Sequence, residues 1–283
     1  MSKVDLHIHS TASDGQLSPA DVVRKSAEAG LTVIALADHD TVDGIAPALE
    51  AAKAFPQIRV LPGVEISTFV PTGEVHVLGY LIDYTHPELQ ATLRRMRNSR
   101  QERAQRMIAK LKNLGLPVEW ERVQEIVGSG SIGRPHIAQA MLEKGYIASF
   151  KEAFNNYIGW GGLAYVERDK MPPAEAVKLI LRVNGLPVLA HPFTINDLET
   201  IVIELKASGL LGIEAYYDGY TAKESKKLVN LAKRYGLIAT GGSDFHGIDA
   251  SIETMIGGAD VPTASAEQLI ALAEQRALKL ASA

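Results

Sequence analysis

The chain has 283 residues, of which 46% are hydrophobic and 22% charged, and its formal net charge is −4. It has no cysteine, which excludes disulfides, zinc thiolates and a thiol nucleophile and leaves His, Asp and Glu to hold any metal. No apolar run is long enough to span a bilayer and the N-terminus lacks a secretory pattern, so we expect a cytoplasmic protein without membrane contact. The negative charge argues against broad nucleic-acid affinity, although a local basic patch can still bind phosphate.

Short apolar runs alternate with amphipathic helical segments along most of the chain, which is typical of βα units around a parallel sheet or barrel. Strands are expected at Val4–Ile8, Val33–Ala37, Arg59–Val64, Val75–Tyr80, Pro187–Ala190, Gly212–Ala215 and Leu237–Thr240. Helices are expected at Ser18–Ala29, Val42–Ala54, Ala174–Val183, Leu198–Ala207, Ala222–Tyr235 and Ala266–Leu280.

The alternation breaks between about Glu88 and Val166, where apolar residues follow a helical period instead. One long helix should end near Pro117. Shorter helices should follow at Glu119–Val127, Pro135–Lys144 and Ser149–Tyr157. This pattern predicts a barrel built from residues 1–92 and 166–283, with residues 93–165 inserted as a small all-helical subdomain.

Histidines are concentrated near the predicted strands. His7 and His9 are two residues apart on the first strand, so both side chains point to one face and can reach one metal. Asp14 follows in the next loop. Such a pair is weak evidence by itself, because a histidine in a strand is often structural.

Five later motifs place a histidine or a carboxylate in or just after an apolar strand. ALADHDT carries His39, LPGVEIS carries Glu65, EVHVLGY carries His76, VLAHPF carries His191, and TGGSDFHG carries Asp244 and His246. The functional groups of parallel βα barrels gather at the carboxyl ends of the strands, so these side chains should meet at one rim. So many coincidences at one rim predict a multinuclear metal site.

Other polar residues near these motifs have simpler interpretations. Asp38 and Asp40 either cap the next helix or orient His39 from behind, and the sequence does not decide between the two. His86 precedes a proline where the helical stretch begins, so we expect a surface or capping residue.

Together the motifs resemble the polymerase-and-histidinol-phosphatase (PHP) family, whose ordered pattern of HxH, Asp, DH, Glu, His, His and DxH is complete here over residues 4–86 and 186–247. The resemblance implies an α/β fold, a distorted, amidohydrolase-like (β/α)7 barrel. The insertion carries SIGRPH, residues 131–136, and in this it resembles the stand-alone members that act on nucleoside 3′,5′-bisphosphates and on short 5′-phosphorylated RNA.

The resemblance also implies three divalent metals, with Mn favoured and Zn, Fe or Mg as alternatives. Glu65 and Asp244 would hold the metal-bound hydroxide that attacks phosphorus. The first metal would be bound by His7, His9, Glu65 and Asp244, the second by Glu65, His76 and His191, and the third by Asp14, His39 and His246.

Substrate recognition is assigned to the insertion. Arg134 lies where a helix begins, and its guanidinium is suited to a remote 5′-phosphate, with Ser131 and His136 assisting. A capping role for Arg134 is the alternative. Phe193, directly after the His191-Pro192 pair, is a candidate for base stacking. Phe154, Tyr157 and Trp160 recur at helical spacing, which favours core packing over a stacking platform.

Residues 94–112 contain eight basic side chains against one acid, Glu102. A basic helix face of this kind is usually just solvated, and the alternative is electrostatic guidance of an anionic substrate or short RNA.

The leading hypothesis is a metal-dependent phosphoesterase that hydrolyses the 3′-phosphate ester of 5′-phosphorylated nucleotides. The same chemistry would degrade short 5′-phosphorylated RNA from its 5′ end. The alternatives are a metal amidohydrolase, a histidinol-phosphatase-like phosphomonoesterase, and a non-catalytic RNA-binding module. The expected partner is a nucleotide or short RNA, and no protein partner is evident.

Overall fold

The computed structural model describes residues 3–70, 73–128, 130–167, 171–247 and 255–281. Seven strands form one sheet in which each strand pairs with its neighbour in sequence. All seven predicted strands are present, and β3 continues well past its predicted end at Val64. The strands are β1 (Val4–Ile8), β2 (Val33–Leu36), β3 (Arg59–Val70), β4 (Gly73–Tyr80), β5 (Leu186–Leu189), β6 (Gly212–Tyr217) and β7 (Ile238–Gly242).

The sheet curls until the segment after β7 meets β1. The N–H of Asp244 donates to the carbonyl of His7 at 2.8 Å, and the N–H of His9 donates to the carbonyl of Phe245 at 3.0 Å. The result is a nearly closed seven-stranded barrel, which confirms the predicted fold class. Because the last strand returns to the first, Asp244 lies beside the HxH strand.

One strand runs against the predicted direction. β4 is antiparallel to both β3 and β5, whereas alternating βα units predict a wholly parallel barrel. Only two residues separate the paired Val70 and Gly73, too few for the crossover that a parallel neighbour requires. The amino-terminal half of β4 therefore meets the carboxyl ends of the other strands, and His76 reaches the rim from within the strand.

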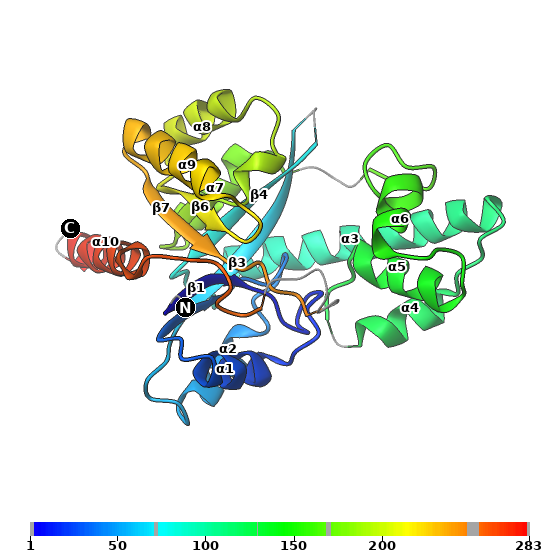
Figure 1. Cartoon of the computed structure of the whole chain (residues 1–283), viewed down its shortest axis with the longest axis horizontal. Helices are drawn as coiled ribbons and strands as arrows, with labels where there is room; N and C mark the ends of the chain where they lie inside the picture. The colour runs from blue at the N-terminus through cyan, green and yellow to red at the C-terminus, as the bar shows by residue number, and fades with distance from the viewer. Residues whose placement is uncertain (1–2, 71–72, 129, 168–170, 248–254, 282–283) are drawn as a thin grey trace.

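Six of the helices in the described residues surround the barrel, and Figure 1 shows how they are arranged around it. The Ser18 hydroxyl accepts from the N–H of Asp21 at 3.1 Å and Pro19 occupies the first turn, so α1 begins as the sequence predicts. Among the helices of the described residues, none combines the length and hydropathy that a membrane span requires. The six are α1 (Pro19–Glu28), α2 (Ile45–Ala52), α7 (Pro173–Arg182), α8 (Leu198–Ala207), α9 (Ala222–Tyr235) and α10 (Thr263–Ala281).

The remaining helices project from one side of the barrel, at the right of Figure 1. The ring of His86 accepts from the N–H of Glu88 at 3.3 Å and so caps α3, in agreement with the predicted role. The helices share an apolar core of their own, which includes Met107, Leu111 and Met141. They are α3 (Pro87–Asn113), α4 (Trp120–Val127), α5 (Arg134–Glu143) and α6 (Phe150–Ala153), and a π-helical turn, η1 (Phe154–Ile158), replaces the end of the last predicted helix.

Candidate active site

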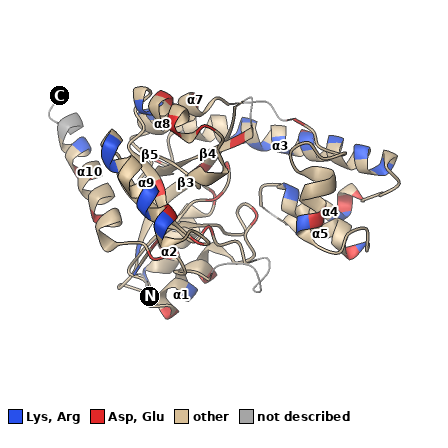
Figure 2. Cartoon of the chain, turned by 45° about the horizontal axis from the view of Figure 1, so that its top comes forward, with Lys and Arg blue, Asp and Glu red and all other residues tan. Residues whose placement is uncertain are grey.

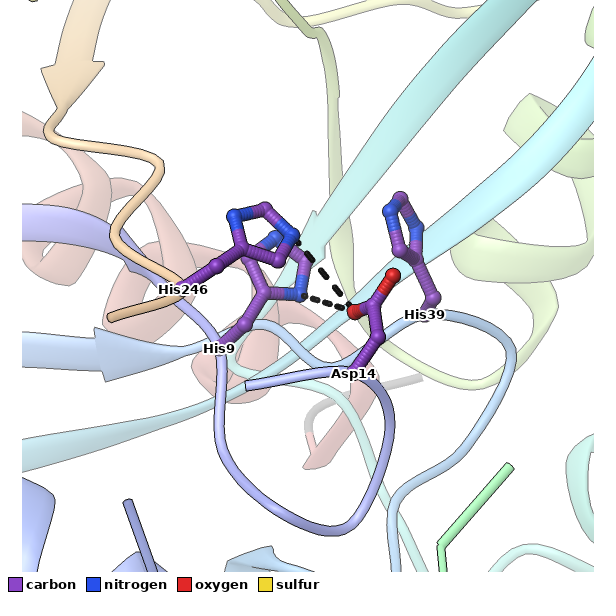
Figure 3. Close-up of side chains that lie close together, drawn as sticks. All are labelled: His9, Asp14, His39 and His246. Atoms are coloured by element: carbon purple, nitrogen blue, oxygen red, sulfur yellow. Dashed lines mark ion pairs between the residues drawn. The ribbon is translucent and has the colours of Figure 1, made fainter. Parts of the chain in front are cut away.

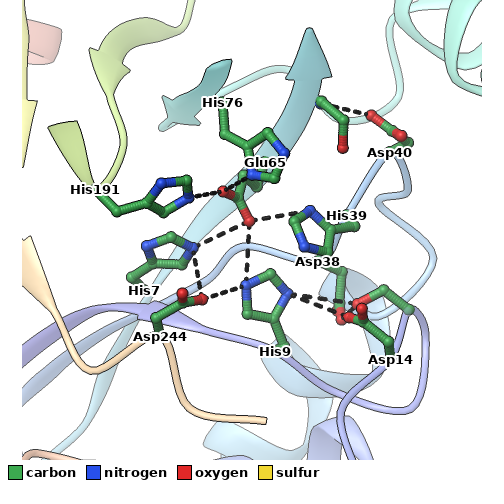
Figure 4. Close-up of polar contacts among 12 residues, drawn as sticks. His7, His9, Asp14, Asp38, His39, Asp40, Glu65, His76, His191 and Asp244 are labelled. Carbon is green, nitrogen blue, oxygen red and sulfur yellow. Dashed lines mark hydrogen bonds and ion pairs between the residues drawn. The ribbon is translucent and has the colours of Figure 1, made fainter. Parts of the chain in front are cut away.

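The rim of the barrel brings together all the side chains that the sequence predicts as metal ligands (Figures 3 and 4). They come from β1, β3, β4 and from the segments that follow β1, β2, β5 and β7. The nine residues are His7, His9, Asp14, His39, Glu65, His76, His191, Asp244 and His246.

One group contains His7, His9, Glu65 and Asp244, each of which offers an atom within 4.8 Å of the others. The Nε2 atoms of His7 and His9 lie 3.1 and 3.2 Å from Oε2 of Glu65. They also lie 3.3 and 3.0 Å from Oδ1 of Asp244. Both imidazoles have no solvent exposure, so His7 on β1 and His9 just after it present two ring nitrogens to one buried point.

The second oxygen of Glu65 faces a different pair of histidines. Oε1 of Glu65 lies 2.8 Å from Nδ1 of His76 and 2.9 Å from Nε2 of His191. His39 also approaches Glu65, with Nδ1 3.0 Å from Oε2. Glu65 is therefore shared between two sets of imidazoles, one at each carboxylate oxygen.

A further group joins His9, Asp14, His39 and His246 (Figure 3). Nε2 of His246 lies 3.5 Å from Oδ1 of Asp14, and Nδ1 of His9 lies 3.9 Å from the same oxygen. The rings of His9 and His246 stack with their centroids 4.1 Å apart. His9 thus belongs to both groups, this one and the one that contains Glu65 and Asp244.

Several ligand atoms in these groups are buried without a hydrogen-bond partner among the described residues. They are Nε2 of His9, Oδ1 of Asp14, Nδ1 of His39 and Oδ1 of Asp244. These atoms lie at ion-pair distances from neighbouring ligand atoms, but none of them forms a hydrogen bond with a described residue. Burying polar atoms without a hydrogen bond costs free energy unless a cation lies between them. Imidazoles and carboxylates without thiolates suit Mn, Zn or Fe. The residues present therefore fit divalent metals.

The acid groups of the site stay ionised. Burial raises the pKa of Glu65, but the imidazoles of His39, His7 and His76 lower it well below its ordinary range. Burial likewise raises the pKa of Asp244, and His7 and His9 lower it further than burial raises it. Burial lowers the pKa of His39 to about 3, so its ring is neutral. For His7 and His246 burial is outweighed by the carboxylates, which raise the pKa of both rings. Metal binding would displace these protons, because ionised carboxylates and neutral imidazoles are the forms that bind metals.

Glu214 is a site residue that the sequence reasoning missed. Its Oε1 lies 3.1 Å from Nδ1 of His7, and its Oε2 accepts from the N–H of His191 at 2.7 Å. The backbone of His191 has a φ of 26°, a costly conformation for a residue with a side chain, and this hydrogen bond holds it. A carboxylate in the apolar strand GIEAYY was the signal that could have found Glu214.

Neither Asp38 nor Asp40 caps the following helix, since the residue at that position is Gly44 and no side chain caps it. Asp38 instead accepts hydrogen bonds from Ser10 and Ser13, which fixes the loop that carries Asp14. Asp40 pairs with the guanidinium of Arg100 at 2.6 Å. From the sequence, Asp38 and Asp40 either cap the next helix or orient His39. In the structure each carboxylate instead holds a neighbouring segment in place.

A cavity of about 170 Å³ opens beside the histidines and is lined on its other side by arginines. Arg103 and Arg134 share one carboxylate, because Glu74 lies 3.6 Å from Nη2 of Arg103 and 2.6 Å from Nη2 of Arg134. The charges of both arginines and of His76 outweigh burial and lower the pKa of Glu74 to about 2. Arg100 also lines this cavity, which we call the arginine pocket.

Arg103 belongs to the basic helix face that the sequence predicts to be solvated. Its side chain is instead buried, and Nη2 has no hydrogen-bond partner among the described residues. Figure 2 shows the basic residues spaced along α3. Arg100 and Arg103 line the arginine pocket, whereas Arg94 and Arg106 are exposed. The composition of the helix did not show which basic residues face the barrel.

The predicted recognition residues lie in different places. Arg134 lines the arginine pocket, and its guanidinium lies over the ring of Phe154 at 5.4 Å. The Nδ1 of His136 accepts from the N–H of Gly133 at 2.9 Å and so caps α5. Ser131 is buried and lines a neighbouring cavity between α3 and α4. Phe193 lies outside both cavities, on the side of His191.

The chain matches the model of the PHP domain over residues 5–243. It is 35% identical over 248 residues to a 5′-3′ exoribonuclease of Haemophilus influenzae, covering 86% of this chain and 90% of that protein. It is 33% identical to a 3′,5′-nucleoside bisphosphate phosphatase of Chromobacterium violaceum, covering 87% and 88%. A solved structure from Bifidobacterium adolescentis, classed as a metal-dependent phosphoesterase, has a TM-score of 0.86 and 27% identity over 95% of each chain.

The chain therefore belongs to the PHP family. It is a phosphoric ester hydrolase whose barrel rim carries His, Asp and Glu clusters able to bind metals.

Proposed function

We propose that the chain hydrolyses the 3′-phosphate ester of 5′-phosphorylated nucleotides, releasing phosphate from nucleoside 3′,5′-bisphosphates and 5′-mononucleotides from short 5′-phosphorylated RNA. One observation carries this proposal. The arginine pocket is lined both by predicted metal ligands (Asp14, His39, His76 and His246) and by Arg100, Arg103 and Arg134. A substrate with two phosphate groups can place one at the histidines and the other at the arginines.

The nine rim side chains would hold three divalent metals, with Mn favoured, in the three sets that the family resemblance implies. When bound, such metals lower the pKa of water and neutralise the charge of the attacked phosphate and of the leaving oxygen. Glu65 and Asp244 would hold and orient the water that attacks phosphorus, a role supported by the position of both carboxylates against the imidazoles of His7 and His9.

Arg134 would bind the remote 5′-phosphate with Arg103 as its neighbour. Arg100 pairs with Asp40, whereas Arg103 and Arg134 share the single carboxylate of Glu74, so these two guanidiniums carry one positive charge more than the carboxylate between them. Glu74 holds both forks in position before substrate arrives. Forked guanidiniums bind phosphate through two parallel hydrogen bonds, which fixes orientation as well as charge.

We further propose that residues 93–165 act as a substrate-recognition subdomain inserted into a barrel formed by residues 1–92 and 166–283. Its separate apolar core supports this division. Two of its helices send Arg103 and Arg134 to the barrel rim, where the arginine pocket lies. The barrel would thus supply the chemistry and the helices the selection of substrate.

The test is to assay manganese-loaded protein on adenosine 3′,5′-bisphosphate and on adenosine 3′-monophosphate, measuring free phosphate and identifying the nucleotide product. We expect fast conversion of the bisphosphate to adenosine 5′-monophosphate and poor turnover of the 3′-monophosphate. Arg134→Ala should lower kcat/KM for the bisphosphate about 10- to 100-fold relative to the 3′-monophosphate, because a hydrogen bond to a charged group contributes about 1.5–3 kcal/mol.

Arg122→Ala is the matched control, since Arg122 is an exposed arginine of α4 that pairs with Glu125 and Glu143. It should leave both rates unchanged. Equal rates of the wild type on both substrates would remove the role given to Arg134 while keeping the phosphoesterase. No phosphate from either substrate, and no nucleotide from short 5′-phosphorylated RNA, would overturn the proposed function.

A further inference from the structure

An aromatic surface extends away from the metal-ligand cluster on the side of His191. Measured between ring centroids, Tyr217 lies 6.1 Å from His191 and 5.0 Å from Tyr220. The ring centroid of Phe193 lies 4.9 Å from that of Tyr220. We call Tyr217, Tyr220 and Phe193 the aromatic wall. Phe193, at the far end of this row of rings, is 42% exposed.

Hydrogen bonds tie the aromatic wall to the site and hold its rings in place. The hydroxyl of Tyr217 donates to Oδ2 of Asp244 at 2.8 Å. The hydroxyl of Tyr220 accepts from the N–H of Phe193 at 3.3 Å. The ring planes of Phe193 and Tyr220 meet at 70°, an edge-to-face contact that fixes the orientation of Phe193 relative to Tyr220.

The aromatic wall and the arginine pocket lie on different sides of the cluster. The rings of His39, His76 and His191 follow one another at 5.1 and 4.9 Å. His39 and His76 line the arginine pocket, whereas His191 leads to Tyr217. Of the described residues that line the pocket, none belongs to the aromatic wall. Tyr217 and Tyr220 line a separate cavity of about 720 Å³ between β6 and α9.

We infer that the aromatic wall stacks on the base of the second nucleotide of a short 5′-phosphorylated RNA. This inference rests on the proposed function. In that reaction the bond between phosphorus and the 3′-oxygen of the first nucleotide breaks. Water supplies a hydroxyl to phosphorus and a proton to the departing oxygen, which leaves a 5′-mononucleotide and an RNA with a new 5′-phosphate. The two nucleotides flank the attacked phosphorus, so their subsites must lie on different sides of the cluster.

The experiment compares a 5′-phosphorylated diadenosine with adenosine 3′,5′-bisphosphate, which has the same first nucleotide and no second base. The probes are cleaved by manganese-loaded wild type, Phe193→Ala and Phe193→Tyr. The ratio of kcat/KM for the dinucleotide to that for the bisphosphate should fall about tenfold or more in Phe193→Ala, the loss expected for one base–aromatic stack. Phe193→Tyr keeps the ring and should keep the ratio.

A dinucleotide with an abasic second ribose isolates the stack. Removing the second base should lower kcat/KM of the wild type about as much as Phe193→Ala lowers kcat/KM for the normal dinucleotide. In Phe193→Ala, removing the second base should cause little further loss of kcat/KM, because the stack is already absent. Ile203→Ala is the matched control, because Ile203 is 51% exposed on α8 and lines neither cavity. That variant should change neither rate.

Several outcomes would overturn the inference and leave the proposed function standing. One is an equal loss of Phe193→Ala on both substrates, which would place the first base on the wall. A second is an unchanged ratio of kcat/KM for the dinucleotide to that for the bisphosphate in Phe193→Ala. A third is a Phe193→Ala variant whose kcat/KM falls as much as that of the wild type when the second base is removed. A wild type that cleaves the bisphosphate and not the dinucleotide would also overturn it. A wild type that cleaves neither would contradict the proposed function itself.

Discussion

Glu214 accepts two hydrogen bonds at the centre of the site, and Glu214→Gln leaves it only one acceptor oxygen. The N–H of His191 is a backbone donor and cannot become an acceptor, so the glutamine oxygen should face it at the 2.7 Å position. The glutamine NH₂ must then face Nδ1 of His7, where the carboxylate oxygen lies 3.1 Å away. In the neutral form of the ring, which is the form that binds a metal, Nδ1 becomes an acceptor and the single ring proton moves to Nε2.

That change of tautomer removes a metal ligand. Nε2 of His7 is the atom that faces Glu65 and Asp244 at 3.1 and 3.3 Å. A protonated Nε2 can donate to these carboxylates, which keeps the metal-free protein satisfied, but it cannot bind a cation. Loss of such a supporting contact typically costs 10- to 100-fold in metal affinity, or about 1.4–2.7 kcal/mol.

The assay is a manganese titration of the metal-free protein by calorimetry, with thermal unfolding of the same samples. We expect Glu214→Gln to bind manganese about 10- to 100-fold more weakly, and the unfolding scans check that the metal-free variant is folded. Glu50→Gln, an exposed carboxylate paired with Lys53 on α2, should match the wild type in both measurements. Unchanged manganese affinity in Glu214→Gln would refute the reasoning, as would the same fall in affinity for Glu50→Gln.

Three further predictions follow from the same geometry. Manganese should stabilise the metal-free protein, adding about 2.7 kcal/mol to the free energy of unfolding at 100 times Kd, so the Tm should rise with the logarithm of the manganese concentration above Kd. A Tm that does not change with manganese would contradict the metal assignment. Gly242→Ala should lower the free energy of unfolding by about 1–3 kcal/mol, measured by urea denaturation, because a β-carbon there would clash with the backbone and Cβ of His7. Asp38→Asn should lower it by about 1–3 kcal/mol and weaken manganese binding, since the amide cannot accept all three hydrogen bonds from Ser10 and Ser13 and the loop carrying Asp14 loosens; native affinity in this variant would show that the loop needs no such anchor.

The sequence by itself determined the strands and the ligand types of the site. Period-two spacing on β1 places His7 and His9 on one face whatever surrounds them, and the apolar runs before His39 and His191 predict strands that end there. These are local properties, because side-chain direction in a strand and the start of a helix depend on a few neighbouring residues. The capping histidine His86 was predictable for the same reason.

Only the tertiary structure decided how those pieces meet. The direction of β4 depends on a two-residue connection, and it turns His76 from a residue inside a strand into one at the rim. Arg103 and its solvent-exposed neighbours on α3 look alike in sequence, yet the packing of α3 against the barrel buries one guanidinium beside Glu74. Glu214 is far from His7 along the chain, and its role exists only because the barrel closes. Charge and hydrogen-bond partners depend on distances in space, and a linear pattern does not contain them.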